Sequence, residues 1–228
     1  MTGHAYTADT LAGRGGAKRA RVAGAGGPLG VAMLCLFALA AIWGAASYLP
    51  AVRVRDAATL HDFTLLDRPA VESIGAFLLH LLEPLLFTIW GAALVFTSLA
   101  RGRSRLAAAV AAVLILAPLT SETLKPLLAH RHDSVGGVHI GAASWPSGTS
   151  TEALTLVLCA VLVAPARRRA LVAVIGACYA AVVGVMLLVF AWHMPSDVLG
   201  GYFVATLWAA LAVAALRLAD SRWPPAQL

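Results

Sequence analysis

The chain has 228 residues, 60% of them hydrophobic, with a mean hydropathy of +0.82 and a formal net charge of +6. An average soluble domain is nearer to half apolar, so this composition excludes an ordinary soluble protein and indicates one that crosses a membrane. The basic residues lie between and beside the apolar segments, which makes the positive charge a sign of membrane topology and gives no reason to expect nucleic-acid binding.

Residues 1–27 are rich in Gly, Ala and Arg and have few apolar side chains to bury, so we expect a disordered basic cytoplasmic tail. Six apolar segments follow, each predicted to be a helix that crosses ~30 Å of hydrocarbon. The expected fold is all-α: a polytopic six-transmembrane-helix bundle over residues 28–218, with a short cytoplasmic tail at 219–228. The six segments are Leu29–Leu49, Ile74–Leu99, Leu106–Thr120, Ala153–Ala166, Ala170–Trp192 and Val198–Leu218.

The distribution of Lys and Arg predicts the orientation of this bundle. Twelve of the seventeen lie in the N-terminal tail, the second and fourth connections, or the C-terminal region, and five lie in the other connections. Because Lys and Arg accumulate on the cytoplasmic side, we expect a multi-pass protein of the cell membrane with both termini in the cytoplasm.

Ionisable side chains interrupt the second apolar segment, where His80 and Glu83 are expected to form a hydrogen-bonded pair near one end of the span. The three cysteines all fall inside predicted spans and have no metal-ligand spacing. They are interpreted as small buried hydrophobic residues.

Two polar segments, 121–151 and 192–201, are predicted to lie on the same extracytoplasmic side. In the second, His193 and Asp197 are four residues apart, a spacing that lets both side chains share one helical face. An aspartate beside one imidazole nitrogen fixes the tautomer and leaves the other nitrogen free as a nucleophile, a base or a metal ligand.

The first polar segment carries residues suited to a phosphate group. Lys125 and Arg131 are fixed positive charges that match phosphate oxygens. Ser147, Gly148 and Thr149 open a helix, where unpaired backbone N–H groups and the helix dipole favour an anion. Together the two segments predict a site for a phosphoryl group.

Three stretches, "LKPLLAHRH", "PSGTS" and "HMPSDVLGG", follow one another in this order on the six-span scaffold. Their order and topology resemble the three signature motifs of the type-2 phosphatidic acid phosphatase superfamily, which are integral-membrane lipid phosphatases. The resemblance covers about residues 75–215. It implies hydrolysis of a lipid phosphate or pyrophosphate, such as a polyprenyl or glycerolipid phosphate, at the extracytoplasmic face.

The resemblance also implies a role for each residue of the motifs. His193 would attack phosphorus and form a phosphohistidine, with Asp197 orienting its ring. Lys125 and Arg131 would bind phosphate oxygens, helped by the start of the helix at residues 147–149. The implied mechanism requires no metal and no other cofactor.

Three departures from the family pattern weaken catalysis more than binding. Thr149 stands where the family has the histidine that protonates the leaving alkoxide, and Leu187 stands where it has an arginine that contacts phosphate. In the first motif Arg131 comes one residue early, and His132 occupies the position of the expected arginine.

A threonine hydroxyl is a poor general acid near neutral pH. Candidates to replace the missing acid are the three histidines of the same loop, His130, His132 and His139. The departures also support an alternative function, that of a non-catalytic relative that binds a lipid phosphate or acts as a partner subunit.

Other interpretations of these residues remain open. His193 with Asp197, and Ser147, could simply cap helices, and Lys125 and Arg131 could be ordinary interfacial cations. Ser147 with His193 could form the dyad of an intramembrane serine protease. A zinc site is a further alternative, with the possible ligands His130, His132, Asp133 and His193.

Overall fold

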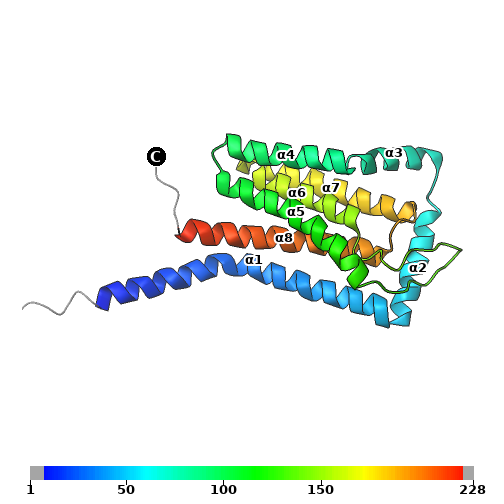
Figure 1. Ribbon diagram of the computed structural model, residues 1–228, viewed down its shortest axis with the longest axis horizontal. Helices are drawn as coiled ribbons and strands as arrows, with labels where there is room; N and C mark the ends of the chain where they lie inside the picture. The colour runs from blue at the N-terminus through cyan, green and yellow to red at the C-terminus, as the bar shows by residue number, and fades with distance from the viewer. Residues whose placement is uncertain (1–7, 223–228) are drawn as a thin grey trace, which may run out of the picture.

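The computed structural model describes the backbone of residues 8–222 and the side chains of residues 25–222, and its regular secondary structure in this range is all helical, with no strand (Figure 1). Eight helices follow in order: α1 (Ala8–Tyr48), α2 (Pro50–Thr64), α3 (Pro69–His80), α4 (Pro84–Ala100), α5 (Ser104–Leu127), α6 (Gly148–Val163), α7 (Ala166–Val189) and α8 (Pro195–Arg222). The prediction of an all-α fold is confirmed.

The long helices lie side by side, and α2 runs across one end of them (Figure 1). Helix α8 packs against α1, α5 and α6, so it is the centre of the bundle. Small residues of α8 such as Ala205 and Ala210 are buried there, while Leu, Ile and Phe side chains on the outer faces are exposed. An apolar exterior around a packed interior is what a lipid-facing surface requires.

Four helices are long and apolar enough to cross a membrane: α1 over Ala25–Tyr48, α5, α7 and α8. The pair α3 and α4 forms a fifth span if its two halves cross together. Helix α6 is apolar but has only 16 residues. The described residues therefore give four or five spans by length, so the predicted count of six is not confirmed.

The second predicted span, Ile74–Leu99, is not continuous. The chain begins α3 at Pro69, breaks after His80 and bends by 52° before α4. Pro84 causes the break, because proline cannot donate a backbone hydrogen bond and forces the preceding residue out of the helical region; Glu83 has φ −56° and ψ 148°. His80 and Glu83 pair at this break, with His80 Nδ1 2.8 Å from Glu83 Oε1, but both side chains are more than half exposed and do not point into the bundle as expected.

The chain ends differ from expectation where they are described. Helix α1 begins at Ala8, so residues 8–27 are helical where the sequence predicted disorder. The segment holds as many glycines as alanines, so helix propensity alone does not explain it; the helix continues directly into the first span. Residues 1–7 and 223–228 lie outside the described residues, and α8 ends at Arg222.

Candidate active site

A tight turn between α7 and α8 carries His193. Helix α7 ends in a Schellman motif: Trp192 N–H donates to the Leu187 carbonyl (2.9 Å) and Ala191 N–H donates to Leu188 (3.0 Å). Ala191 takes the left-handed conformation at φ 53° that this motif needs. Pro195 then starts α8 at a position where its missing N–H is not needed. The turn thus holds His193 between two helix ends.

His193 and Asp197 face each other, but the turn before α8 brings them together and they do not share a helical face, because α8 begins only at Pro195. His193 Nδ1 lies 3.5 Å from Asp197 Oδ2, and the aspartate side chain is fully buried. The distance is that of a close ion pair and is longer than a good hydrogen bond. Asp197 Oδ2 also accepts a hydrogen bond from the Met194 N–H at 2.9 Å. The carboxylate therefore caps α8 and lies beside the imidazole at the same time.

The first turn of α6 is joined directly to the first turn of α8. Ser147 is the N-cap of α6; its buried Oγ accepts from the Ser150 N–H at 3.3 Å. The Ser147 N–H donates to the Asp197 carbonyl at 2.9 Å. Ser147 therefore has the capping role. Burial of its hydroxyl gives no support to a serine protease, whose nucleophile must reach the substrate.

Buried hydroxyl groups fix this junction. Ser150 Oγ donates to the Val198 carbonyl at 3.1 Å, and Thr151 Oγ1 lies 3.0 Å from Ser121 Oγ of α5. Gly201 of α8 packs so closely that an added Cβ would lie 2.5 Å from the Ser147 carbonyl oxygen. Helices α5, α6 and α8 are thus held at fixed positions around the site.

Lys125 brings positive charge to the start of α6. Its Nζ lies 2.6 Å from Glu122 Oε1, one turn earlier in α5. An added Cβ on Gly148 would lie 3.3 Å from this Nζ and 2.7 Å from Glu122 Oε1, so the ammonium lies against the first residue of α6. Lys125 also lines, with His193, a cavity of about 350 Å³ that we call the polar cavity; its other lining residues are His139, Ile140, Gly141, Ala143, Ser144, Ala191 and Trp192.

Arg131 is not brought to this cluster. Its side chain is exposed and does not line the polar cavity. The next residue, His132, points inward instead: its Nε2 lies 2.9 Å from Ser144 Oγ, and His193 and Asp197 act on it electrostatically. Burial lowers the pKa of the His132 imidazole. His132 is thus a largely neutral group where the family places an arginine.

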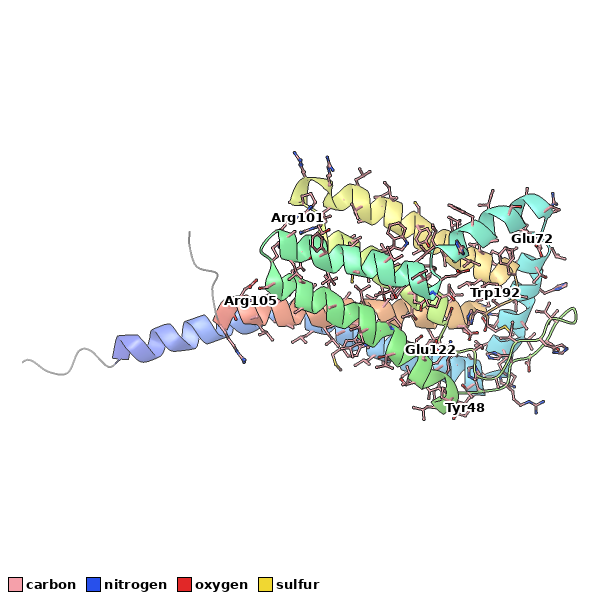
Figure 2. All side chains as sticks on the ribbon, turned by 45° about the horizontal axis from the view of Figure 1, so that its top comes forward. Tyr48, Glu72, Arg101, Arg105, Glu122 and Trp192 are labelled. Atoms are coloured by element: carbon pink, nitrogen blue, oxygen red, sulfur yellow. The ribbon has the colours of Figure 1, made fainter. Side chains whose placement is uncertain are left out.

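Thr149 faces a second, larger cavity of about 900 Å³, which we call the apolar cavity. Trp192 lines both cavities, so the two lie next to each other. Figure 2 shows Trp192 and Glu122 toward the end of the bundle that α2 crosses, and Arg101 and Arg105 toward the opposite end. The lining of the apolar cavity is Asp67, Glu72, Ala76, Phe77, Leu79, His80, Leu82, Glu83, Pro84, Thr149, Glu152, Phe190 and Trp192.

A family model, that of the PAP2 superfamily, matches residues 104–219, which is more than half of the chain and includes all three motifs. The chain belongs to the PAP2 superfamily. This is the type-2 phosphatidic acid phosphatase group that the motifs resembled, so the resemblance is confirmed.

A solved structure of the same superfamily supports the fold. The chain is similar to the crystal structure of "the first transmembrane PAP2 type phosphatidylglycerolphosphate phosphatase from Bacillus subtilis", with 24% identity and a TM-score of 0.65. The similarity covers 88% of this chain and 98% of the Bacillus subtilis chain. No curated protein matches the chain.

Within this PAP2 fold, Leu187 does not reach the site. It is fully buried in a core cluster with Val183, Met194 and Val198. The position where the family has an arginine is therefore part of the hydrophobic core, and Lys125 is the cation that the described residues bring to the polar cavity.

Sequence reasoning missed Asp56 and Glu152. Asp56 of α2 binds Ser196, which lies between His193 and Asp197 in the sequence. Nothing local in its mixed-charge segment signals this contact. Glu152 carried a signal, because it follows Thr149 by three residues and so shares its face of α6.

No group of three or more His, Cys, Asp or Glu side chains with the geometry to hold a metal ion occurs in the described part of the chain. The rings of His130 and His132 contact each other at 4.6 Å between centroids, and Asp133 pairs with Arg53 of α2 at 3.5 Å. These contacts give the zinc alternative no support.

Proposed function

We propose that this PAP2 superfamily member is a membrane lipid phosphatase that hydrolyses a lipid phosphate or pyrophosphate. The observation that carries the proposal is the convergence of His193, Lys125 and the first turn of α6 where the polar cavity meets the apolar cavity. A phosphate in the first cavity and a lipid chain in the second would fit a substrate with one charged and one apolar end.

In the proposed reaction, Lys125 and the N–H groups of Gly148 and Thr149 hold the phosphate oxygens. His193 Nε2 attacks phosphorus as the bond to the lipid oxygen breaks, which gives a phosphohistidine and a lipid alcohol. Water then cleaves the nitrogen–phosphorus bond and releases inorganic phosphate. Asp197 beside Nδ1 stabilises the positive charge that forms on the ring during attack.

The proposed location is the extracytoplasmic face of the cell membrane. The Lys and Arg distribution supports it, since Arg101 and Arg105 lie at the end of the bundle opposite to Trp192 (Figure 2). Polyprenyl and glycerolipid phosphates are both compatible with the apolar cavity. Phosphatidylglycerol phosphate, the substrate named for the Bacillus subtilis protein, belongs to the glycerolipid class.

A second candidate function is lipid-phosphate binding without turnover, by the chain alone or as a partner subunit. Thr149 and Leu187 favour it, because neither supplies the proton or the charge found at these positions in the family.

Phosphate release by purified protein in detergent, measured over a panel of lipid phosphates with His193→Ala beside the wild type, tests the proposal. We expect turnover that the substitution abolishes. Binding of a lipid phosphate that survives in both proteins, with no turnover in either, would support the non-catalytic candidate instead.

A further inference from the structure

We propose that Glu152 is the catalytic acid of this protein, donating the proton that the leaving lipid oxygen needs. This inference rests on the proposed phosphatase function. It assigns to a carboxyl group on α6 the role that the family gives to a histidine at the position of Thr149.

The position of Glu152 on α6 supports this role. Thr149 and Glu152 are three residues apart in the first turns of α6, so their side chains share one face of the helix. Both line the apolar cavity, whereas the residues between them, Ser150 and Thr151, are buried in the hydroxyl network toward α5 and α8. A side chain at residue 152 therefore reaches the same cavity as one at residue 149.

The direction of the reaction requires a donor in this cavity. In phosphoryl transfer the attacking and leaving atoms are roughly in line on opposite sides of phosphorus. His193 lines the polar cavity and is absent from the lining of the apolar one, while Glu152 lines the apolar cavity and is absent from the polar one. His193 and Glu152 thus line different cavities that share Trp192, which is compatible with a nucleophile and an acid acting from different sides of a phosphate held between them.

The surroundings of Glu152 suit an acid that starts protonated. The side chain is half-buried, and the charged groups that act on it are Glu122 and Lys125 of α5. Desolvation and a neighbouring carboxylate both favour the neutral form of a carboxyl group, and Lys125 opposes this. The other titratable groups that line the cavity are Asp67, Glu72, His80 and Glu83.

The loop histidines are less well placed for the same task. His139 lines the polar cavity on the side of the nucleophile. His132 is engaged with Ser144 Oγ, and His130 Nδ1 lies 3.1 Å from the Leu128 carbonyl oxygen. None of the three lines the apolar cavity.

The proton balance of the step is complete. As His193 Nε2 bonds to phosphorus and the phosphorus–oxygen bond to the lipid breaks, the Glu152 carboxyl proton moves to the lipid oxygen. This gives the lipid alcohol and a Glu152 carboxylate. When water attacks the phosphohistidine, the carboxylate takes a proton from that water, His193 departs from phosphorus, and inorganic phosphate forms.

A comparison of two leaving groups tests the inference. An alkoxide is a strong base and must be protonated as it leaves, whereas a phosphate is a weak base and can leave almost without protonation. Wild type and Glu152→Gln are assayed on dioleoyl phosphatidic acid, which releases an alcohol, and on farnesyl diphosphate, which releases farnesyl phosphate. We expect the substitution to lower turnover of phosphatidic acid by about 10²–10⁴-fold and to change turnover of farnesyl diphosphate by less than about threefold. Asp62→Asn on α2, which neutralises an exposed carboxylate that lines neither cavity, serves as the control.

An equal loss on both substrates would mean that Glu152 is structural, and no loss on phosphatidic acid would mean that another group is the acid; either result overturns the inference. Wild-type turnover that His193→Ala abolishes would leave the proposed function intact in both cases. Absence of turnover by the wild type on either substrate would instead overturn the proposed function, and the inference with it.

Discussion

Asp56 of α2 accepts two hydrogen bonds from Ser196 of α8, one at each carboxylate oxygen. The Ser196 hydroxyl lies 2.6 Å from Oδ2, and the backbone N–H lies 3.1 Å from Oδ1. Ser196 directly precedes Asp197 and is itself buried. A helix outside the family motifs therefore holds the turn that carries His193.

Replacing Asp56 by alanine should destabilise the protein and lower its turnover. The change leaves two buried donors of Ser196 without partners, at a cost of about 1–3 kcal/mol each, and frees the first turn of α8. Thermal unfolding in detergent and phosphate release measure the two effects. Asp62→Ala, an exposed change on the same helix, is the control. Equal melting temperatures for the two variants would contradict the role of Asp56.

The Asp56 contact should also depend on pH. Burial raises the pKa of the Asp56 carboxyl above its ordinary value of 3.8, and the hydrogen bonds from Ser196 partly oppose this. The folded state thus binds the proton more tightly than the unfolded state. The contribution of this group to stability is greatest below 3.8 and declines as the pH rises through the folded pKa.

The melting temperatures of the wild type and of Asp56→Asn, measured at about pH 4 and at about pH 7, test this pH dependence. We expect the wild type to lose stability relative to the variant as the pH rises. A difference in melting temperature that stays constant over this range would show that burial of the charge has no such effect.

Two glycines of the site should respond differently to alanine. At Gly201 a Cβ meets the Ser147 carbonyl oxygen, a backbone atom that cannot move aside, so Gly201→Ala should cost about 1–3 kcal/mol of stability. At Gly148 it meets the flexible ends of Glu122 and Lys125, so Gly148→Ala should fold normally but displace the ammonium and slow turnover. Melting temperature and phosphate release, measured for both variants, separate these outcomes.

Lys125 and Arg131 should contribute unequally. Lys125 lies against α6 and lines the polar cavity, whereas Arg131 is exposed and lines neither the polar nor the apolar cavity. We expect Lys125→Ala to reduce kcat/KM by about 10–100-fold, in line with loss of a charge-assisted contact, and Arg131→Ala to change it by less than about threefold. A larger effect at Arg131 would restore the role that the motif implies for it.

Thr149→His, made in the Glu152→Gln background, should recover turnover of phosphatidic acid. The new imidazole would lie at the family position of the acid and face the apolar cavity. An increase of at least about tenfold over Glu152→Gln alone is expected from a repositioned acid. The single variant Thr149→Ala should be close to wild type, since the threonine hydroxyl donates no proton in the proposed reaction.

Local patterns in the sequence predicted much of this site. The His193–Asp197 pair was expected from the separation of the two residues, the start of α6 at residues 147–149 from its residue types, and Lys125 from its charge; the structure brings these residues to one end of the bundle. Hydropathy predicted most of the long helices, because a long apolar segment is identified from its own residues without knowledge of its tertiary contacts.

What the sequence did not reveal depends on contacts between distant segments or on single backbone positions. Asp56 meets Ser196 across 140 residues, and no periodicity reports such a contact. Arg131 lies in an irregular loop, where a shift of one residue decides whether the arginine or His132 points inward. The division of the second span follows from Pro84, whose effect a hydropathy average over the segment hides.

The length of α6 bears on how a lipid would meet this protein. Sixteen residues rise about 24 Å, several ångströms less than the ~30 Å of a hydrocarbon core. With its C-terminal end held near one interface by the arginines that begin α7, the N-terminal end of α6 would stop below the other interface. A lipid in that leaflet could then present its phosphate to Lys125 without moving outward from the leaflet. The bilayer would thus position the lipid phosphate near the site, whereas short-chain, water-soluble esters would not be positioned in this way.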